Sequence, residues 1–195
     1  MSEWWTYGLS DFLMFSPQAY WRLVARHNEA GWPVQALGQA AVLALPLLLW
    51  RDAAWPRRAA LLLLALAWAA VGWFFHARLY SEIFLAAPWV GTACAIVSLG
   101  LLLVALLPPR GEAGSGARTV GLALLAAAVL YPLVAPLTGH AWTEAEVFGW
   151  MPDPTALATL GVICMLPLRP GVRVLLGTLP ALSFALGMAT RGLLA

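Results

Sequence analysis

Six long apolar segments, separated by short polar connections, are the feature that most constrains how this chain can fold. Of its 195 residues, 62% are hydrophobic and 10% are charged, whereas about a quarter of the residues in a soluble domain are charged. Backbone groups in lipid must be hydrogen-bonded within their own segment, so apolar spans form helices. The sequence therefore predicts an all-α, polytopic transmembrane helical bundle with six spans, at residues 32–50, 59–75, 83–107, 120–137, 155–168 and 172–190.

The fifth segment is shorter than the others. It has 14 residues between Pro154 and Pro170, and a helix needs about 17–25 residues to cross the bilayer core. Two arrangements follow for this part of the chain. With six spans, the segment is either a tilted hairpin partner or a span that recruits residues 147–151. Otherwise the bundle has five spans and one re-entrant segment.

Residues 1–31 precede the first span and have a different pattern. Ser16 and Pro17 form the cap-then-proline signature of a helix start. In the helix that follows, apolar and charged residues occupy different sides, which is typical of a helix in the membrane interface. We therefore expect an N-terminal interfacial amphipathic helix within residues 1–31. Residues 32–195 form the six-helix transmembrane domain, and the whole chain is a single domain.

Arginine is distributed unequally between the two sides of the predicted bundle. The connections after the first, third and fifth spans carry seven arginines, and the other side carries four. Because the side richer in Lys and Arg normally faces the cytoplasm, both termini are predicted to lie on the outer side of a cytoplasmic (inner) membrane. Most acids and all three histidines fall on that outer side as well.

The charge composition limits the partners that the chain can have. Its net charge is +2, and it contains no lysine. No basic cluster indicates nucleic-acid binding. The expected partners are therefore the lipid bilayer and either another protein or a second copy of the chain. Cys94 and Cys164 are isolated within apolar segments, as expected for buried thiols.

Polar residues from three segments are expected to meet at the outer face. These segments are residues 4–17, residues 76–82 between the second and third spans, and the loop 140–154. The loop contains three acids and no basic residue, in a chain that is otherwise mostly hydrocarbon. The candidate binding residues at this face are His76, Tyr80, Glu82, His140, Glu144, Glu146, Asp153 and Asp11.

A metal site is one hypothesis for these residues. Imidazole and carboxylate groups together suit zinc, iron, nickel or copper, so the candidate ligands are His76, His140, Glu144 and Glu146. Their spacing matches no metal-binding motif, and the ligands would have to converge from separate loops. The alternative is that these groups are solvated or paired with Arg78. The sequence identifies no cofactor.

Two local patterns in the loop have chemical meaning. Glu144 and Glu146 are two residues apart, so in an extended loop both carboxylates would point the same way and could share a proton or a cation. Asp153 and Pro154 have the cap and first-turn positions of a helix start. This start would direct the positive end of the helix dipole toward the acidic loop, and that end could also receive an anion.

Few polar side chains fall inside the predicted spans. Gln35 and Gln39 are about one helical turn apart, and Tyr131 lies in the fourth span. These residues are predicted either to hydrogen-bond between helices or to line a pathway. No acid or arginine lies deep in a predicted span, which argues against a proton-driven pump.

Two stretches resemble a family of uncharacterised bacterial multi-span membrane proteins. The first is the opening W-W-T-Y-G-L-S-D-F, residues 4–12, and the second is E-V-F-G-W-M-P-D-P-T-A-L-A-T-L-G, residues 146–161. The resemblance implies a bacterial origin and a multi-span fold. It implies no activity.

The sequence leaves three classes of function open. The first is a small-solute or cation transporter or channel with an acidic, aromatic binding vestibule on the outer face. The second is a non-catalytic accessory subunit or assembly factor of a membrane complex. The third is a metal- or haem-binding membrane enzyme, for which no catalytic residue is identified. A continuous polar path past Gln35 and Gln39 would favour transport, and a solid apolar midplane would count against it.

Overall fold

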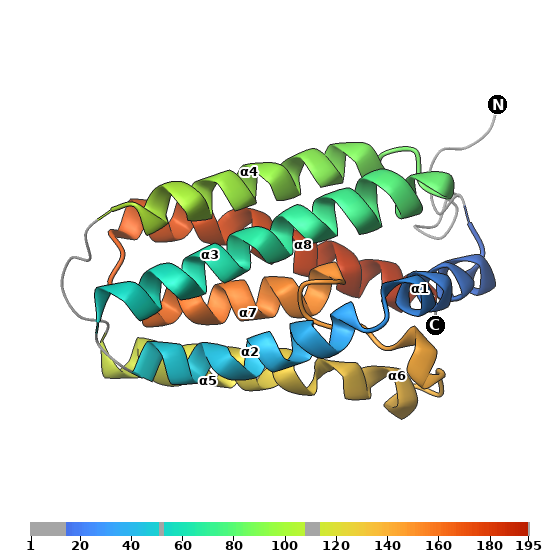
Figure 1. The fold of residues 1–195 in the computed structure, drawn as a ribbon. Coiled ribbons are helices and arrows are strands. Elements are labelled where there is room, and N and C mark those ends of the chain that lie inside the picture. The colour runs from blue at the N-terminus through green and yellow to red at the C-terminus, as the bar shows by residue number, and fades with distance from the viewer. Residues whose placement is uncertain (1–14, 51–52, 108–113, 195) are drawn as a thin grey trace, which may run out of the picture.

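The computed structural model describes residues 15–50, 53–107 and 114–194. These residues form an all-helical bundle, in which α1 lies across one end (Figure 1). The axis of α1 is turned by 88° from that of α2. The elements are α1 (Pro17–Gly31), α2 (Val34–Trp50), α3 (Ala54–Ala70) with its continuations η3 (Val71–Leu79) and η4 (Tyr80–Glu82), α4 (Ala87–Ala105), α5 (Ser115–Leu130), η5 (Tyr131–Leu133), α6 (Val134–Leu137), η6 (Trp142–Glu144), α7 (Pro152–Met165) and α8 (Pro170–Leu194).

Each of the six predicted segments corresponds to a helix, but the helices differ in length. α2 has 17 residues, the lower limit for crossing the bilayer core, and counts as a candidate span only together with α1 as a bent pair, whereas α7 has 14 residues. The described residues therefore contain four candidate spans, or five with the bent pair, where six were predicted. These apolar helices indicate a membrane protein. The four candidate spans are Ala54–Glu82, Ala87–Ala105, Ser115–Leu137 and Pro170–Leu193.

The start of α1 follows its sequence signature. Ser16 has an extended backbone, and its hydroxyl accepts a hydrogen bond from the Ala19 N–H at 3.2 Å. Proline at the first position of the helix has no N–H that would need a partner. The prediction of a helix beginning at Pro17 is confirmed. Its location in a membrane interface stays a prediction.

Although it is short, α7 forms the centre of the bundle. It packs mainly against α5 and α8, and 11 of its 14 residues are buried. Glycine permits the closest helix crossings. A Cβ on Gly161 would lie 2.8 Å from the Gly121 carbonyl oxygen in α5, and a Cβ on Gly91 in α4 would lie 2.9 Å from the Gly72 carbonyl oxygen. Small residues at such contacts let helix backbones approach closely in membrane proteins.

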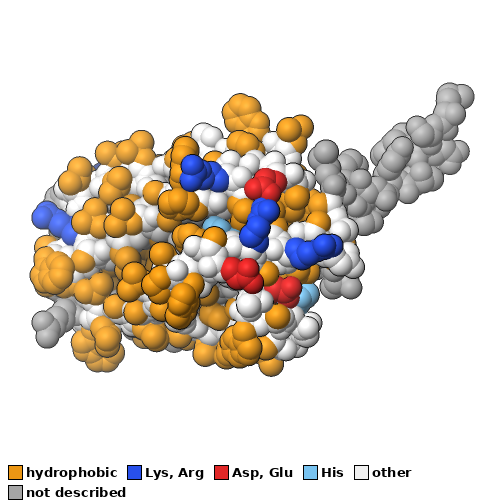
Figure 2. Space-filling model, turned by 45° about the vertical axis from the view of Figure 1, so that its right-hand side comes forward, with side chains coloured by type: hydrophobic (Ala, Val, Ile, Leu, Met, Phe, Trp, Pro, Cys, Tyr) orange, Lys and Arg blue, Asp and Glu red, His pale blue; other side chains and the backbone are white. Residues whose placement is uncertain are grey.

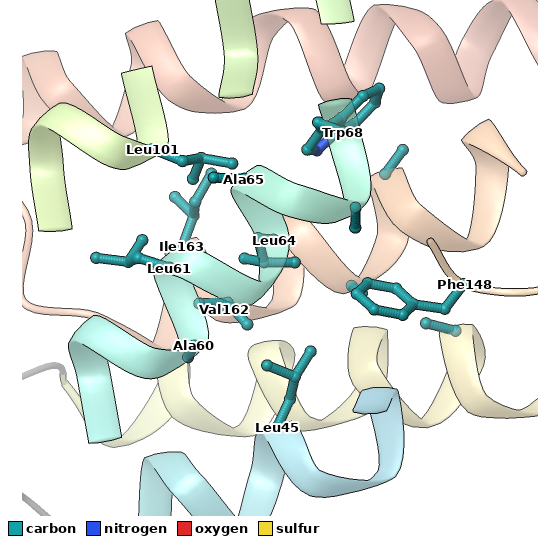
Figure 3. Packing of buried hydrophobic residues seen from close by; sticks show 14 of the residues in the cluster. Leu45, Ala60, Leu61, Leu64, Ala65, Trp68, Leu101, Phe148, Val162 and Ile163 are labelled. Atoms are coloured by element: carbon teal, nitrogen blue, oxygen red, sulfur yellow. The ribbon is translucent and has the colours of Figure 1, made fainter. Parts of the chain in front are cut away.

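The middle of the bundle is filled by apolar side chains. One continuous cluster of buried residues extends through α2, α3, α4, α5, α7 and α8. Two polar bridges reach α3: the Trp68 Nε1–H donates to Thr159 Oγ1 of α7 at 2.8 Å, and the Ser98 hydroxyl of α4 donates to the Ala65 carbonyl oxygen at 2.8 Å. Figure 3 shows core side chains from four helices and from the loop before α7, including Leu45, Leu64, Trp68, Leu101, Ile163 and Phe148.

The connection between α6 and α7 enters the bundle instead of lying on its surface. Phe148 and Met151 are fully buried. Gly149 has a φ of 74°, which favours glycine, and its N–H donates to Thr155 Oγ1 at 2.8 Å. Residues 147–151 thus continue from the start of the short α7 toward the end of the bundle. That they complete a membrane crossing with α7 stays a prediction.

The two ends of the bundle differ in charge. α1, α6, η6 and the start of α7 form one end, which we call the α1 end, and acidic side chains gather toward it (Figures 1 and 2). The first turns of α3, α5 and α8 form the opposite end, which we call the arginine end. Which end faces the cytoplasm stays a prediction. The described arginines of the arginine end are Arg57, Arg58, Arg118, Arg169 and Arg173.

Candidate functional site

Buried charge is concentrated at the α1 end, between α8 and the loop before α7. Arg191 of α8 donates from Nη1 to Glu146 Oε1 at 2.7 Å and from Nη2 to Asp153 Oδ2. The Tyr131 hydroxyl donates to the same Asp153 oxygen at 3.0 Å. The Arg191 guanidinium also lies 5.3 Å from the centre of the Tyr131 ring. We call these four residues the Arg191 cluster.

The cluster is nearly closed to solvent. The side chains of Glu146 and Asp153 are 6% and 2% exposed, and that of Arg191 is 15% exposed. Within the described structure, Glu146 Oε2 and Asp153 Oδ1 have no hydrogen-bond partner. A cavity of about 10 Å³ adjoins Glu146 and Arg191, which is close to the smallest space that holds one water molecule. A Cβ on Gly187 would collide with the Asp153 carboxylate, so glycine lets α8 approach this group.

One guanidinium faces two carboxylates, so the cluster carries a charge of −1 when both acids are ionised. Burial raises the pKa of Glu146 to about 7; the charge of Asp153 adds to this shift, and Arg191 opposes it. Because close like charges resist double ionisation, the cluster holds a proton readily near neutral pH.

Stability is therefore expected to depend on the proton at Glu146. The pKa of this carboxyl is about 7 in the folded protein and 4.5 ordinarily. The stabilisation by the bound proton is complete below about pH 4.5 and is lost as the pH rises through 7. Between pH 5 and pH 8, the free energy of unfolding should fall by on the order of 2 kcal/mol from this group. Glu146→Gln should remove this dependence of the free energy of unfolding on pH, measured by denaturation in detergent. Glu29→Gln, on the exposed side of α1, should leave it unchanged, and equal slopes in both variants would refute the assignment.

α1 holds the loop of the cluster in place. The Asn28 side-chain amide donates to the carbonyl oxygens of Thr143 at 2.7 Å and Ala145 at 2.8 Å. The His27 ring stacks on Trp150 with 4.2 Å between ring centres and 7° between planes. Trp150 Nε1 in turn donates to the His27 carbonyl oxygen at 3.2 Å. These contacts fix the loop immediately before and after Glu146.

His140 and Glu144 form a separate pair nearer the surface. Glu144 Oε2 lies 3.2 Å from His140 Nδ1 and accepts the Ala141 N–H at 3.0 Å. The His140 ring packs on Trp21 of α1, with 3.8 Å between ring centres. Glu144 thus binds its own loop while Glu146 binds Arg191. The two carboxylates that share a cation are Glu146 and Asp153, and not the predicted pair.

Asp153 does not have its predicted role as a helix cap. α7 begins two residues earlier than predicted, at Pro152, and its cap residue Met151 makes no side-chain cap bond. The Asp153 carboxylate is directed instead to Arg191 and Tyr131. A charged and a phenolic donor in a buried site bind a carboxylate more strongly than a backbone N–H does. The prediction of Asp153 as the cap residue is therefore wrong, although Asp153 does lie in the first turn.

The other candidate residues lie in different places. His76 is buried against the rings of Phe75 and Tyr80. Glu82 pairs at 2.5 Å with Arg26 of α1, on the surface, and not with Arg78. Asp11 lies outside the described residues. The described part of the chain contains no group of three or more His, Cys, Asp and Glu side chains able to hold a metal. Of the four predicted metal ligands, His140 and Glu144 form a pair, and the set is not brought together.

The two glutamines serve helix packing. Gln35 Nε2 donates to the Asn28 carbonyl oxygen at 2.6 Å. Gln39 Nε2 donates to the Val129 carbonyl oxygen of α5 at 2.7 Å. Both amides are therefore bound to neighbouring helices, and the apolar cluster fills the bundle next to them. Of the two predicted roles for these residues, the structure supports hydrogen bonding between helices.

The sequence alone did not identify Arg191 as the central residue of the cluster. The arginine was counted only as a topology signal on the outer side. One sequence feature could have identified it: the loop 140–154 has three acids and no base, so a base near a helix end on the same side becomes the available partner. The contact partners Glu146 and Asp153 lie 45 and 38 residues away.

The fold and the cluster together define a class: a helical membrane protein with an apolar core and one buried, charged cluster at an end of its bundle. Comparison with protein families places the chain more closely. It belongs to the family of unknown function DUF6064, which matches residues 17–191 and so includes the whole Arg191 cluster. Comparisons with curated proteins and with solved structures found no match.

Proposed function

We propose that this protein is a non-catalytic accessory or assembly subunit of a membrane complex. The observation that carries the proposal is the solid apolar middle of the bundle. Buried side chains from six helices fill it, and Gln35 and Gln39 are bound to neighbouring backbone. A transporter needs a polar path between its two faces, and the described bundle interior offers none.

The topology belongs to the same proposal. The chain crosses the bacterial cytoplasmic membrane six times, with both termini and α1 on the outer side and with α1 in the interface. The arginines at the starts of α3, α5 and α8 support an inner location for that end. The turn of 88° between α1 and α2 suits a chain in which α1 lies parallel to the membrane surface as far as Gly31 and α2 then crosses the bilayer. α7 and residues 147–151 together make the fifth crossing.

The α1 end offers a surface for the partner. A shallow depression of about 500 Å³ is bordered by Trp21, Arg22, His140 and Glu144, and Trp142 is exposed beside it. Aromatic residues and arginine are enriched in protein interfaces. The hydrogen bonds from Asn28 to the loop keep this surface rigid, which lowers the entropy lost on binding.

Purification from native membranes in mild detergent tests the proposal. The full chain should migrate as one discrete complex larger than itself, and a photo-crosslinker at Gln18 should give one product of constant mass. Arg22→Glu should reduce recovery of the complex by about tenfold or more, because charge reversal at an interface is unfavourable. Arg78→Glu, next to Trp73 and away from the depression, is the matched control. A lone chain without any crosslinked product would contradict the proposal.

The Arg191 cluster favours cation-coupled transport of a small solute as the second candidate. A buried site with one cation for two acids can bind and release a proton. Purified protein in liposomes with a pH-sensitive dye distinguishes the candidates. Transport requires a proton flux that Glu146→Gln and Asp153→Asn abolish. An accessory subunit gives the same low flux in all three proteins.

A further inference from the structure

A second cavity lies at the arginine end of the bundle, with a volume of about 260 Å³. It is enclosed by the first turns of α3, the end of α4 and the connection between α7 and α8. Leu61, Val104, Leu166 and Val172 make its walls apolar. The volume is slightly below the range of about 300–1,000 Å³ for small-molecule pockets. It therefore accommodates part of a flexible hydrocarbon chain and not a bulky ligand.

Positive charge surrounds this apolar space. Arg57, Arg58 and Arg169 border it, and its described lining contains no acid. α3 and α8 both begin here, at Ala54 and Pro170, so the positive ends of two helix dipoles add to the charge of the arginines. Arg58 and Arg169 are exposed. An anionic group is therefore complementary to the rim, while the walls are complementary to hydrocarbon.

The surroundings of the cavity fit the level of the lipid headgroups. Trp50 and Trp55 are exposed at this end of the bundle, and tryptophan is enriched where acyl chains meet headgroups. Leu106 and Leu107, at the end of α4, are also exposed apolar residues. A ligand with an anionic head and an apolar tail can reach both parts of the cavity from the surrounding bilayer.

We propose that this cavity binds one anionic phospholipid from the surrounding leaflet. The phosphate lies at Arg58 and Arg169, and one acyl chain enters between α3, α4 and the α7–α8 connection. A free phosphate would leave the apolar walls uncovered, and a neutral lipid would not match the positive charge of Arg58 and Arg169. Basic pockets between membrane helices bind anionic headgroups for the same reason. The site is independent of the proposed subunit function and of the Arg191 cluster.

The test uses the full chain in detergent, titrated with phosphatidylglycerol while bound lipid is counted by native mass spectrometry. One phosphatidylglycerol should bind per chain, more tightly than phosphatidylcholine. The double variant Arg58→Gln and Arg169→Gln should weaken phosphatidylglycerol binding about 30-fold, equivalent to about 2 kcal/mol for two arginines. Val172→Trp should also weaken it, because the indole fills the cavity while the arginines remain. Arg22→Gln with Arg78→Gln, at the α1 end, removes the same charge and should not change binding.

Each other outcome would overturn the proposal. Equal affinity for phosphatidylglycerol and phosphatidylcholine would exclude recognition of the charge. Equal losses in the two double variants would show a general charge effect. Competition by glycerol phosphate at the same concentration as lipid would show that a free phosphate is the ligand and that the acyl chain contributes nothing. Unchanged binding in Val172→Trp would place the lipid outside this cavity.

Discussion

Replacing Arg191 with leucine is expected to lower the free energy of unfolding by about 3–5 kcal/mol at pH 8, because a buried ion pair loses one partner. Glu146 and Asp153 would both remain buried, with only Tyr131 to donate to them. Leucine retains part of the apolar bulk of the arginine stem next to Tyr131 and Met188, so the loss reports mainly on charge. Denaturation of the full chain in a neutral detergent, at pH 8 and pH 5, measures the effect.

The pH dependence separates this explanation from a simple packing defect. At pH 5 the carboxyl groups of Glu146 and Asp153 can take up protons, and neutral groups need no cation, so the loss should be smaller than at pH 8. Adding Glu146→Gln and Asp153→Asn to Arg191→Leu should restore much of the stability at pH 8. Arg78→Leu is the matched control, since Arg78 is exposed beside Trp73. If Arg191→Leu were as stable as the wild type at pH 8, Glu146 and Asp153 would not need Arg191 as a buried partner, which would contradict the proposed cluster.

Much of the fold was predictable because a membrane helix has two simple requirements, apolar length and internal hydrogen bonding. The six segments were found as helices on these grounds, and the start at Pro17 was found from the Ser16-Pro17 signature. The sequence could not predict which helices lie in the protein interior and which face the lipid. Lipid and protein interior are both apolar, so α7 and α8 have similar compositions although 11 of 14 residues are buried in α7 and α8 is mostly exposed. Hydropathy cannot distinguish the two environments.

The candidate site was predictable as a location and not as a set of contacts. The unequal distribution of charge placed Glu144, Glu146 and Asp153 at one end, and all three lie at the α1 end of the bundle. The partners come from distant parts of the chain. Arg26 and Glu82 are 56 residues apart, and no local spacing encodes such pairs. His76 was predicted to be a binding residue because histidine is a polar residue type, but its side chain is buried among aromatic rings.

Phe148→Ala should lower the free energy of unfolding by about 3–5 kcal/mol, the usual effect of removing a buried phenyl ring. The ring is 1% exposed and packs in the core between α2, α3 and α7, although it belongs to a loop (Figure 3). No other part of the connection from residues 138 to 151 reaches that cluster of core residues within the described chain. The free energy of unfolding of the full chain in detergent measures the effect. Leu66→Ala is the control: Leu66 is 68% exposed on α3, and its truncation should change stability by less than about 0.5 kcal/mol.

Phe148→Ala also tests whether the core and the Arg191 cluster are coupled. Glu146 lies two residues before Phe148 in the same loop, and its raised pKa depends on burial. If the ring fixes the loop, its loss should let water reach Glu146, lower the pKa of that carboxyl and reduce the dependence of stability on pH between 5 and 8. Hydrogen exchange at residues 145–151 should increase in parallel. A stability loss with an unchanged pH slope and unchanged exchange would mean that α1, through Asn28 and His27, holds Glu146 in place without help from the core.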